Sequence, residues 1–364
     1  MSTTSSIHAY VTGFPSRKAT AIVAKLLRDG HTVTLLARDT ASAAQVFGKH
    51  AALRVLQGEP WGIDFSLSEL EYKALCRDVT HIFHVPNARI GSGAGEAARD
   101  CVSSTREALS LLGDVRASAR LTHVSTVLTL RCDEGVARED MRADPARHRS
   151  QVLRAYAHAE RMVDADTRNQ SQIVRTGIAF GDAHTGDFEP GSWGHVLAAF
   201  VLDSSEDLPL PIPVPERSTL NLVPTDYVAQ AVVALGLRVA GPTSECFHVV
   251  DGKPYSARRV LDLLAEAAGR AAPRYSVPAP VWQALWRAPW VGAAAGRGRA
   301  HVVEGLLASS LYDASNTRAV LGELVDACPD FTSYVKPVVD RMKAYKRAGG
   351  RSLDAGLSDD DIPG

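Results

Sequence analysis

The sequence predicts an α/β fold built on a doubly wound parallel sheet. Short runs of β-branched and aromatic residues alternate along the chain with stretches whose apolar residues recur at helical spacing. This alternation is typical of parallel strands joined by right-handed helical crossovers. The first run, 7–11, leads through a turn into a helical pattern that closes on Gly30. Sheets of this kind bind ligands beyond the carboxyl ends of their strands.

Four more strand-like runs follow in the first third of the chain. A helical stretch comes after the first of them, and a longer helix, predicted over 96–114, precedes the last. The four runs occupy 31–38, 53–59, 79–87 and 120–130.

The rest of the chain is less regular. A polar, charged stretch after residue 130 is predicted to be a loop or lid, and the proline-rich run 208–216 must be extended, because proline is excluded from helix interiors and central strands. Most of the chain after residue 270, up to about residue 348, is predicted to be helical. The other expected elements are a helix over 153–166, a strand over 172–182, a strand, turn and helix over 220–235, a strand over 245–252 and a helix over 255–270.

Composition indicates a folded protein without an evident charged partner. Hydrophobic residues at 45% and charged residues at 22% exclude disorder for most of the 364 residues. A formal net charge of −1 gives no attraction for nucleic acid or an anionic membrane, so neither is expected as a partner. Five widely spaced cysteines without a C-x-x-C pair favour buried thiols over disulfides or a metal site. With no signal-peptide pattern and no long apolar window, the protein is expected to be cytoplasmic.

Six segments, spread over nearly the whole chain, match one family in order. They are VTGFPSRKA, THIFHVPNA, THVSTV, VRTGIAFGD, LNLVPTDYVAQAVVAL and LYDASNTRAVLGELVDACPDFTSYV. The set resembles the extended short-chain dehydrogenase/reductase superfamily, and within it the thioester-reductase or fatty-acyl reductase branch. The resemblance implies a Rossmann-like sheet, a smaller, mainly helical C-terminal substrate lobe and a small-molecule substrate. It also implies a nicotinamide cofactor and, since dimers are common in the family, a homodimer.

The predicted division of the chain follows this pattern. The Rossmann-like domain is expected over 1–185, with 217–250 returning to it, and the substrate lobe over 186–216 and 251–348. The remaining residues, 349–364, are expected to form a flexible tail.

Three tryptophans fall within one short span of the expected lobe. They are expected to line an apolar pocket for an acyl or polyketide-like substrate, or else to pack a helical core. The three are Trp282, Trp286 and Trp290.

The turn after the first strand, where the family grips the cofactor pyrophosphate, is altered. Three glycines there normally allow the tight turn, the approach of the pyrophosphate and the packing of the helix on the strand. Gly13 is kept, whereas Ser16 and Ala19 replace the other two. Arg17 and Lys18 follow at the predicted helix N-terminus, where they are expected either to grip a phosphate or to be surface charges.

Arg38 decides which dinucleotide is expected. It stands at the end of the second strand, where an acidic residue would hold the ribose of NAD, and an arginine there suits the 2′-phosphate of NADP. The alternatives are a solvent-facing arginine and a protein without a cofactor. The expected cofactor-binding set also includes Thr12, Asn87 and Thr176. Asn87 stands where the family strand ends in two small alanines, so its bulk predicts a narrowed groove.

The family's catalytic group is also altered. Its members use a serine or threonine, a tyrosine, and a lysine four residues after the tyrosine. Thr126, with Ser125 beside it, fits the first position. In one helix frame Tyr156 stands at the tyrosine and Glu160 at the lysine; in the other, which keeps the family's Ala-Glu register, Val152 and Tyr156 stand there. Both frames lose the tyrosine–lysine couple.

These departures favour chemistry without strong redox character. Tyr156 and Glu160, four residues apart, are expected to form an acid–base pair aimed at Thr126; the alternative is an ordinary helix with Glu160 on its surface. His84 and His123 are a second candidate pair or, alternatively, packed polar groups. We predict an atypical family member, a metabolic enzyme with non-redox or weakly redox chemistry on an acyl-type intermediate. An NADPH-dependent reductase and a catalytically silent binding protein are the alternatives.

Overall fold

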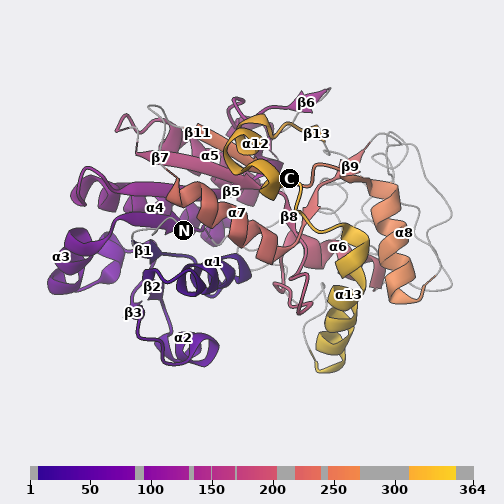
Figure 1. The fold of residues 1–364 in the computed structure, drawn as a ribbon, viewed down its shortest axis with the longest axis horizontal. Helices are drawn as coiled ribbons and strands as arrows, with labels where there is room; N and C mark the ends of the chain where they lie inside the picture. Colours follow the sequence, from indigo (N-terminus) through magenta and orange to yellow (C-terminus); the bar gives the residue numbers. More distant parts are fainter. Residues whose placement is uncertain are drawn as a thin grey trace.

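A seven-stranded parallel sheet forms the centre of the described part of the chain (Figure 1). Its strand order is β11-β7-β5-β4-β1-β2-β3, and helices cover both of its faces. The predicted α/β fold with a doubly wound parallel sheet is therefore confirmed. The computed structural model describes residues 7–86, 94–130, 135–148, 150–168, 170–202, 218–238, 245–270 and 311–349.

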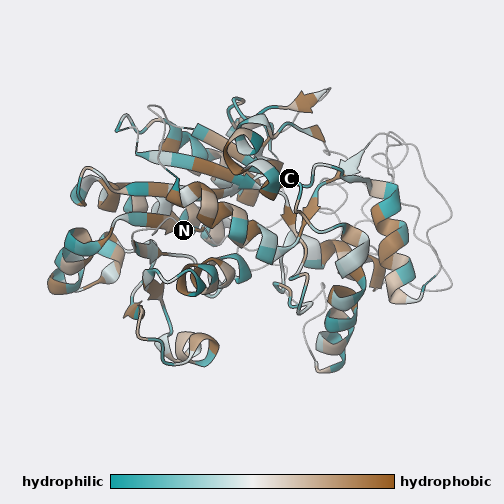
Figure 2. Ribbon diagram, in the orientation of Figure 1, coloured by the Kyte–Doolittle hydropathy of each residue, from teal (hydrophilic) through white to brown (hydrophobic). Residues whose placement is uncertain are grey.

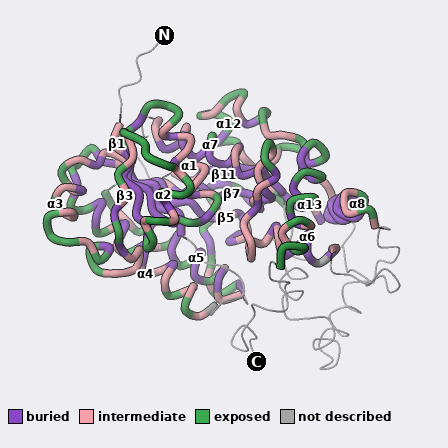
Figure 3. Tube along the Cα trace, turned by 90° about the horizontal axis from the view of Figure 1, so that it is seen from below, coloured by how far each residue is buried: buried purple, intermediate pink, exposed green. Residues whose placement is uncertain are grey.

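The elements of the large sheet alternate as the sequence predicts. Its strands are β1 (His8–Val11), β2 (Thr32–Ala37), β3 (Leu53–Gln57), β4 (His81–His84), β5 (Arg120–Thr126), β7 (Ser171–Thr176) and β11 (Glu245–Val249). Helices α1 (Arg17–Arg28) and α7 (Thr225–Leu237) lie on one face, and α4 (Ala94–Asp114) and α5 (Gln151–Asp164) on the other (Figure 3). The shorter helices α2 (Thr40–Phe47) and α3 (Glu69–Asp78) follow β2 and β3.

Burial in the central strands includes their polar residues, such as His84 on β4 and His123 on β5. In β1, β2, β4 and β5 nearly every residue is buried, as expected for central strands that are covered on both faces. Hydrophilic and hydrophobic residues alternate along both the strands and the helices (Figure 2). This burial makes the central strands a firm support for side chains at their carboxyl ends.

A second hydrophobic core lies outside the sheet. Phe180, Phe331 and Tyr334 form its aromatic centre, with ring centroids of neighbouring pairs 5.2 and 5.4 Å apart. Its helices are α6 (Trp193–Leu202), α8 (Ala257–Ala268) and α13 (Phe331–Arg347). Two short strand pairs accompany them. In one, β8 (Ile178–Ala179) pairs with β10 (Leu222–Val223), and in the other, β9 (Thr219–Leu220) pairs with β12 (Tyr255–Ser256). The described residues thus form a separate core among these helices, in addition to the hydrophobic packing on the sheet.

Two predicted strands are shorter in the structure. The run 120–130 leaves the sheet at Thr126, whose side chain accepts a hydrogen bond from the Leu128 amide and starts a 3-10 turn. The run 172–182 divides at Gly177, whose amide still donates to Val249. The next amide donates to Asn221 instead, so β8 joins a different sheet. Both strands were predicted too long, because a local change of hydrogen-bond partner does not alter the hydrophobic pattern of the sequence.

The stretch predicted as a loop or lid is attached to the C-terminal part of the chain. Within it, β6 (Val136–Ala137) pairs with β13 (Leu311–Tyr312). The Glu139 carboxylate, 2% exposed, accepts hydrogen bonds from the amides of Asn316 and Thr317 at the start of α12 (Ser315–Leu321). It also accepts one from the amide of His248 on β11. Hydrogen bonds therefore attach this segment to the β11 edge of the sheet.

Several predictions fall outside the described residues. They concern Asn87, the proline-rich run 208–216, the tail beyond residue 349 and the tryptophans at 282, 286 and 290. Among the helices that are described, none combines the length and the apolar character needed to cross a bilayer.

Candidate functional site

Gly13 closes the turn at the carboxyl end of β1. Its φ of +93° lies in the region that favours glycine, and a Cβ at this position would lie 2.0 Å from the carbonyl oxygen of Val85. The neighbouring Thr12 amide donates to the Phe83 carbonyl at 3.1 Å, which holds the turn against β4. The first glycine of the motif is therefore required by the backbone itself.

Gly13→Ala is expected to cost more stability than Gly30→Ala. Both glycines have positive φ, which costs about 1–3 kcal/mol for other residues, but Gly30 has no atom within 4 Å of a built Cβ. Only the first variant adds a collision with the Val85 carbonyl. Urea denaturation measures both losses, and equal losses would contradict the proposed collision.

Ser16, at the place of the second glycine, serves the helix that follows. Its hydroxyl oxygen accepts a hydrogen bond from the Ala19 amide at 3.2 Å, so Ser16 is the N-cap of α1. Ser16 is 6% exposed, and Ala19, at the third glycine position, is fully buried. A serine before a helical pattern is a common capping signal, which the sequence therefore contained.

A carboxylate lies at the N-terminus of α1. The backbone amide of Arg17 donates to Oε2 of Glu189 at 2.5 Å, and the Arg17 guanidinium lies 3.6 Å from Asp187. Lys18 is partly buried; burial lowers the pKa of its ammonium group to about 8, although nearby Glu189 acts in the opposite direction. Dinucleotide-binding folds hold a pyrophosphate at this helix end. No sequence motif singled out Glu189 or Asp187.

Arg38 follows the end of β2, and 61% of its side chain is exposed. Its Nε lies 3.1 Å from Oε2 of Glu59, and its guanidinium carbon lies 5.1 Å from the ring centroid of Trp61. The position is thus solvent-facing and positively charged, next to an aromatic ring. This arrangement is compatible with both alternatives raised by the sequence.

Thr12 belongs to a buried histidine cluster. Its hydroxyl lies 2.8 Å from Nδ1 of His84, whose Nε2 lies 3.1 Å from the Thr105 hydroxyl. The His84 and His123 rings are 5.4 Å apart, and both His123 nitrogens lack a hydrogen-bond partner among the described residues. Burial lowers the pKa of His84 far below its usual value and that of His123 to about 3. Both rings are therefore neutral packed groups near neutral pH.

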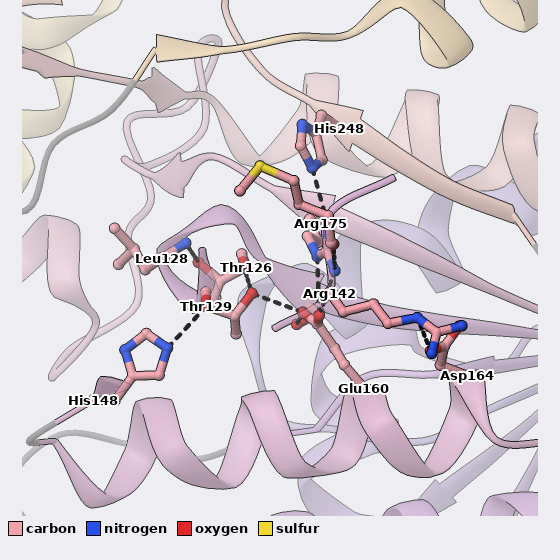
Figure 4. A network of polar contacts seen from close by, with 11 residues as sticks. Thr126, Leu128, Thr129, Arg142, His148, Glu160, Asp164, Arg175 and His248 are labelled. Atoms are coloured by element: carbon pink, nitrogen blue, oxygen red, sulfur yellow. Dashed lines mark hydrogen bonds and ion pairs between the residues drawn. The ribbon is translucent and has the colours of Figure 1, made fainter. Parts of the chain in front are cut away.

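Glu160 forms a buried ion pair with Arg175 (Figure 4). Nε and Nη2 of Arg175 donate to one carboxylate oxygen at 2.9 and 2.8 Å, and the Thr129 hydroxyl donates to the other at 2.9 Å. The Ser125 hydroxyl donates to that second oxygen as well. Only 2% of the Glu160 side chain is exposed, so the alternative of a surface glutamate was wrong.

The ion pair continues into a longer polar network. Nη2 of Arg175 also donates to the Met141 carbonyl at 2.9 Å, and its Nη1 lies 3.3 Å from Nε2 of His248. Burial, with the charge of Arg175, lowers the pKa of His248 to about 3. The neutral ring can then accept from Arg175 while its Nδ1, 2.7 Å from the Asp313 carbonyl, donates. The Arg175 guanidinium therefore connects strand β7 with β11 and with the segment that contains Met141.

The side chains of Tyr156 and Glu160 contact different parts of the protein. Its hydroxyl donates to the Pro86 carbonyl, just beyond β4, at 2.8 Å. Val152, one turn earlier, is 7% exposed and packs in a small apolar cluster with Cys101. The hydrogen bonds described for Tyr156 and Glu160 thus lead to different partners, and α5 does not present them as one acid–base unit.

The remaining predicted residues divide between the strand end and the interior. Thr126 is half-buried at the last position of β5. The Thr176 hydroxyl is fully buried and donates to the Ser125 carbonyl at 3.2 Å, which ties β7 to β5. The structure therefore brings Ser125 and Glu160 together, while Thr126 lies at the carboxyl end of β5 and the Tyr156 hydroxyl, on α5, contacts the chain just beyond β4.

Two further polar features are a cavity beside the Glu160–Arg175 pair and a carboxylate–histidine group in the turn after β8. A cavity of about 500 Å³ adjoins the Glu160–Arg175 pair, and charges of both signs line it, including Arg142 paired with Asp164 at 3.0 Å. Asp182, His184 and Asp226 place one potential metal-ligand atom each within 4.8 Å of the others. The Asp182 and Asp226 carboxylates already accept backbone amides of residues 183–185, so they close the turn after β8.

Comparison with known proteins identifies the family. The NAD-binding family described as "Male sterility protein" matches residues 11–232. Among curated protein sequences, none matches this chain.

Solved structures share the fold. The terminal R domain from the myxalamid PKS-NRPS biosynthetic pathway is 19% identical, with a TM-score of 0.70 over 95% of this chain and 92% of that domain. The reductase domain of a nonribosomal peptide synthetase from Mycobacterium tuberculosis is 17% identical, with a TM-score of 0.67 over 94% and 92%. An NAD complex of dTDP-glucose 4,6-dehydratase from Bacillus anthracis is 13% identical, with a TM-score of 0.64 over 94% and 98%. The chain belongs to the NAD-binding "Male sterility protein" family, within the extended short-chain dehydrogenases/reductases.

Proposed function

We propose that this protein is an atypical short-chain dehydrogenase/reductase-fold enzyme that acts on an acyl or polyketide-like intermediate without hydride transfer. The proposal rests on what surrounds Val152, Tyr156 and Glu160 on helix α5. Glu160 is fixed in the interior by its ion pair with Arg175. This fixed position supports the alignment that keeps Glu160 at the family's glutamate. In that alignment Val152 stands at the family's tyrosine and Tyr156 at its lysine. The packed Val152 side chain cannot donate a proton, and Tyr156 is a weak substitute for a lysine.

Family membership supports a nicotinamide cofactor, NADP included. The groups that fit its phosphates are the turn at Gly13, the N-terminus of α1, Lys18 and, for a 2′-phosphate, Arg38. The Glu189 carboxylate opposes this fit, because it already accepts the Arg17 amide. A bound nicotinamide would supply hydride chemistry.

Thr126 and Tyr156 are the proposed substrate-binding hydroxyls. They lie at or just beyond the carboxyl ends of β5 and β4, which are adjacent strands. Hydroxyl groups in such positions can hold a carbonyl oxygen and exchange a proton with it. Ser125 and Glu160 would act as positioning residues, because their hydrogen bond fixes the end of β5 on α5.

The second hydrophobic core is the proposed substrate lobe. It contains the apolar side chains of α6, α8 and α13 that would contact an acyl chain. An acyl thioester that binds there should protect these helices from limited proteolysis, and unchanged cleavage would count against this part of the proposal.

A reductase of carbonyl or thioester groups is the second candidate. Exposed Arg38 beside Trp61 favours it, because a 2′-phosphate and an adenine could both be held there. The fold neighbours from PKS-NRPS and nonribosomal peptide pathways include domains described as reductases.

The test is conversion of acyl thioesters by protein stripped of nucleotide, followed by mass spectrometry. We expect product without nucleotide, reduced about a hundredfold in Tyr156→Phe and in Thr126→Val. Tyr72→Phe, on α3, removes a hydroxyl that donates to Asp114 instead, so it should leave the rate unchanged. Product that forms only with NADPH, and that carries deuterium from 4-deuterated NADPH, would instead identify the reductase.

A further inference from the structure

We propose that Glu189 occupies the phosphate position at the N-terminus of α1 and must leave before a dinucleotide can bind. The site that the family uses for its cofactor would then be closed by the chain's own carboxylate. The inference deepens the proposed function and rests on its assignment of this cofactor site, because it names what keeps a dinucleotide from supporting hydride transfer.

The first support is the hydrogen bonding of the helix end. Helix α1 has 12 residues, and its first turn contains no acidic side chain that could offset the helix dipole. The Ala19 amide is taken by Ser16, and the Arg17 amide by Glu189 at 2.5 Å. At that distance the Arg17 N–H is fully used, so a phosphate oxygen would have to replace the carboxylate oxygen.

The second support is the charge around the contact. Lys18 attracts Glu189 electrostatically from the same helix turn. Asp187, two residues before Glu189, lies 3.6 Å from Arg17 and 3.0 Å from Arg341 on α13. The segment thus presents two carboxylates to the cations that a phosphate group would otherwise meet.

The third support is that the segment around Glu189 is itself anchored. Phe188 is 6% exposed and stacks on His195, with ring centroids 5.1 Å apart, and it also contacts Tyr345 edge-on at 5.5 Å. Gly186, with φ of +71°, fits so closely that a Cβ would lie 2.7 Å from the Pro337 carbonyl. An anchored carboxylate acts at a high effective concentration, so it competes strongly with a ligand in solution.

The experiment is calorimetric titration of the full chain with NADPH and, separately, with inorganic pyrophosphate. Glu189→Ala is expected to bind both ligands about tenfold more tightly than the unaltered protein. Glu189→Gln, nearly isosteric, should bind them with intermediate affinity, since it removes the charge but keeps an acceptor. Asp187→Asn should have a smaller effect, because the Arg17 amide remains occupied.

Glu69→Gln, an exposed glutamate on α3, controls for the change in net charge and should leave both affinities unaltered. Equal affinities of the unaltered protein, Glu189→Gln and Glu189→Ala would overturn the inference. Absence of NADPH binding to Glu189→Ala at millimolar concentration would overturn it as well. Neither result depends on turnover, whereas the proposed function fails if no product forms without nucleotide or if deuterium is transferred from NADPH to the product.

Discussion

Replacing Arg175 by alanine is expected to lower the free energy of unfolding by about 3–5 kcal/mol, because it leaves a buried carboxylate without its ion-pair partner. Only 2% of the Glu160 side chain and 3% of the Arg175 side chain are exposed. The same substitution also removes a donor from the Met141 carbonyl and a partner from His248. Equilibrium unfolding in urea measures the loss.

An exposed ion pair provides the matched control. Arg142 lies 3.0 Å from Asp164, but 81% of its side chain is exposed, so Arg142→Ala should cost at most about 1 kcal/mol. The double variant Glu160→Leu with Arg175→Met should be more stable than either single variant, because no charge is left buried alone. If Arg175→Ala costs no more than Arg142→Ala, the buried pair does not hold the site together.

Lowering the pH from 6 to 5 is expected to reduce the free energy of unfolding by about 3–4 kcal/mol, through three buried histidines. Burial lowers the pKa of His84, His123 and His248, in the last two to about 3. The unfolded chain therefore binds protons near pH 6.5 that the folded chain does not accept. Stability rises with pH in this range and is lost as the pH falls below 6.5, by about 1.4 kcal/mol per unit and histidine.

A histidine variant separates this effect from general acid sensitivity. His123 has two ring nitrogens without described partners, so His123→Phe should fold and should lower the pH slope by about one proton. Burial also lowers the pKa of His8 and His81, which adds to this loss of stability, whereas it raises the pKa of the carboxyls of Glu139 and Asp251, which act in the opposite direction. A flat stability profile between pH 6 and 5 would contradict the assignment of neutral histidines.

The fold was predictable because local patterns determine it. The strand runs were found from their apolar character, and their alternation with helices indicates a doubly wound parallel sheet. The turn at Gly13 was found because positive φ leaves few choices of residue. The exact strand ends were missed at Thr126 and Gly177, where the chain exchanges one hydrogen-bond partner for another.

The candidate site was less predictable because distant segments build it. Helical spacing correctly places Tyr156 and Glu160 one turn apart, yet it says nothing about Arg175 on β7, which takes the carboxylate. The contact between Glu189 and the Arg17 amide joins residues 172 positions apart, and no local signal announces it. Such contacts depend on the order of strands in the sheet and on the second core.

The hydrogen bonds that surround the Glu139 carboxylate also have a consequence for biosynthesis. During translation Glu139 leaves the ribosome 177 residues before Asn316, one of the donors that surround it in the finished protein. Until Asn316 and Thr317 have emerged, burial of this carboxylate would leave it short of hydrogen bonds and is therefore unfavourable. We therefore expect the N-terminal strands to assemble during synthesis, whereas the β11 edge of the sheet closes only once the C-terminal part has been made.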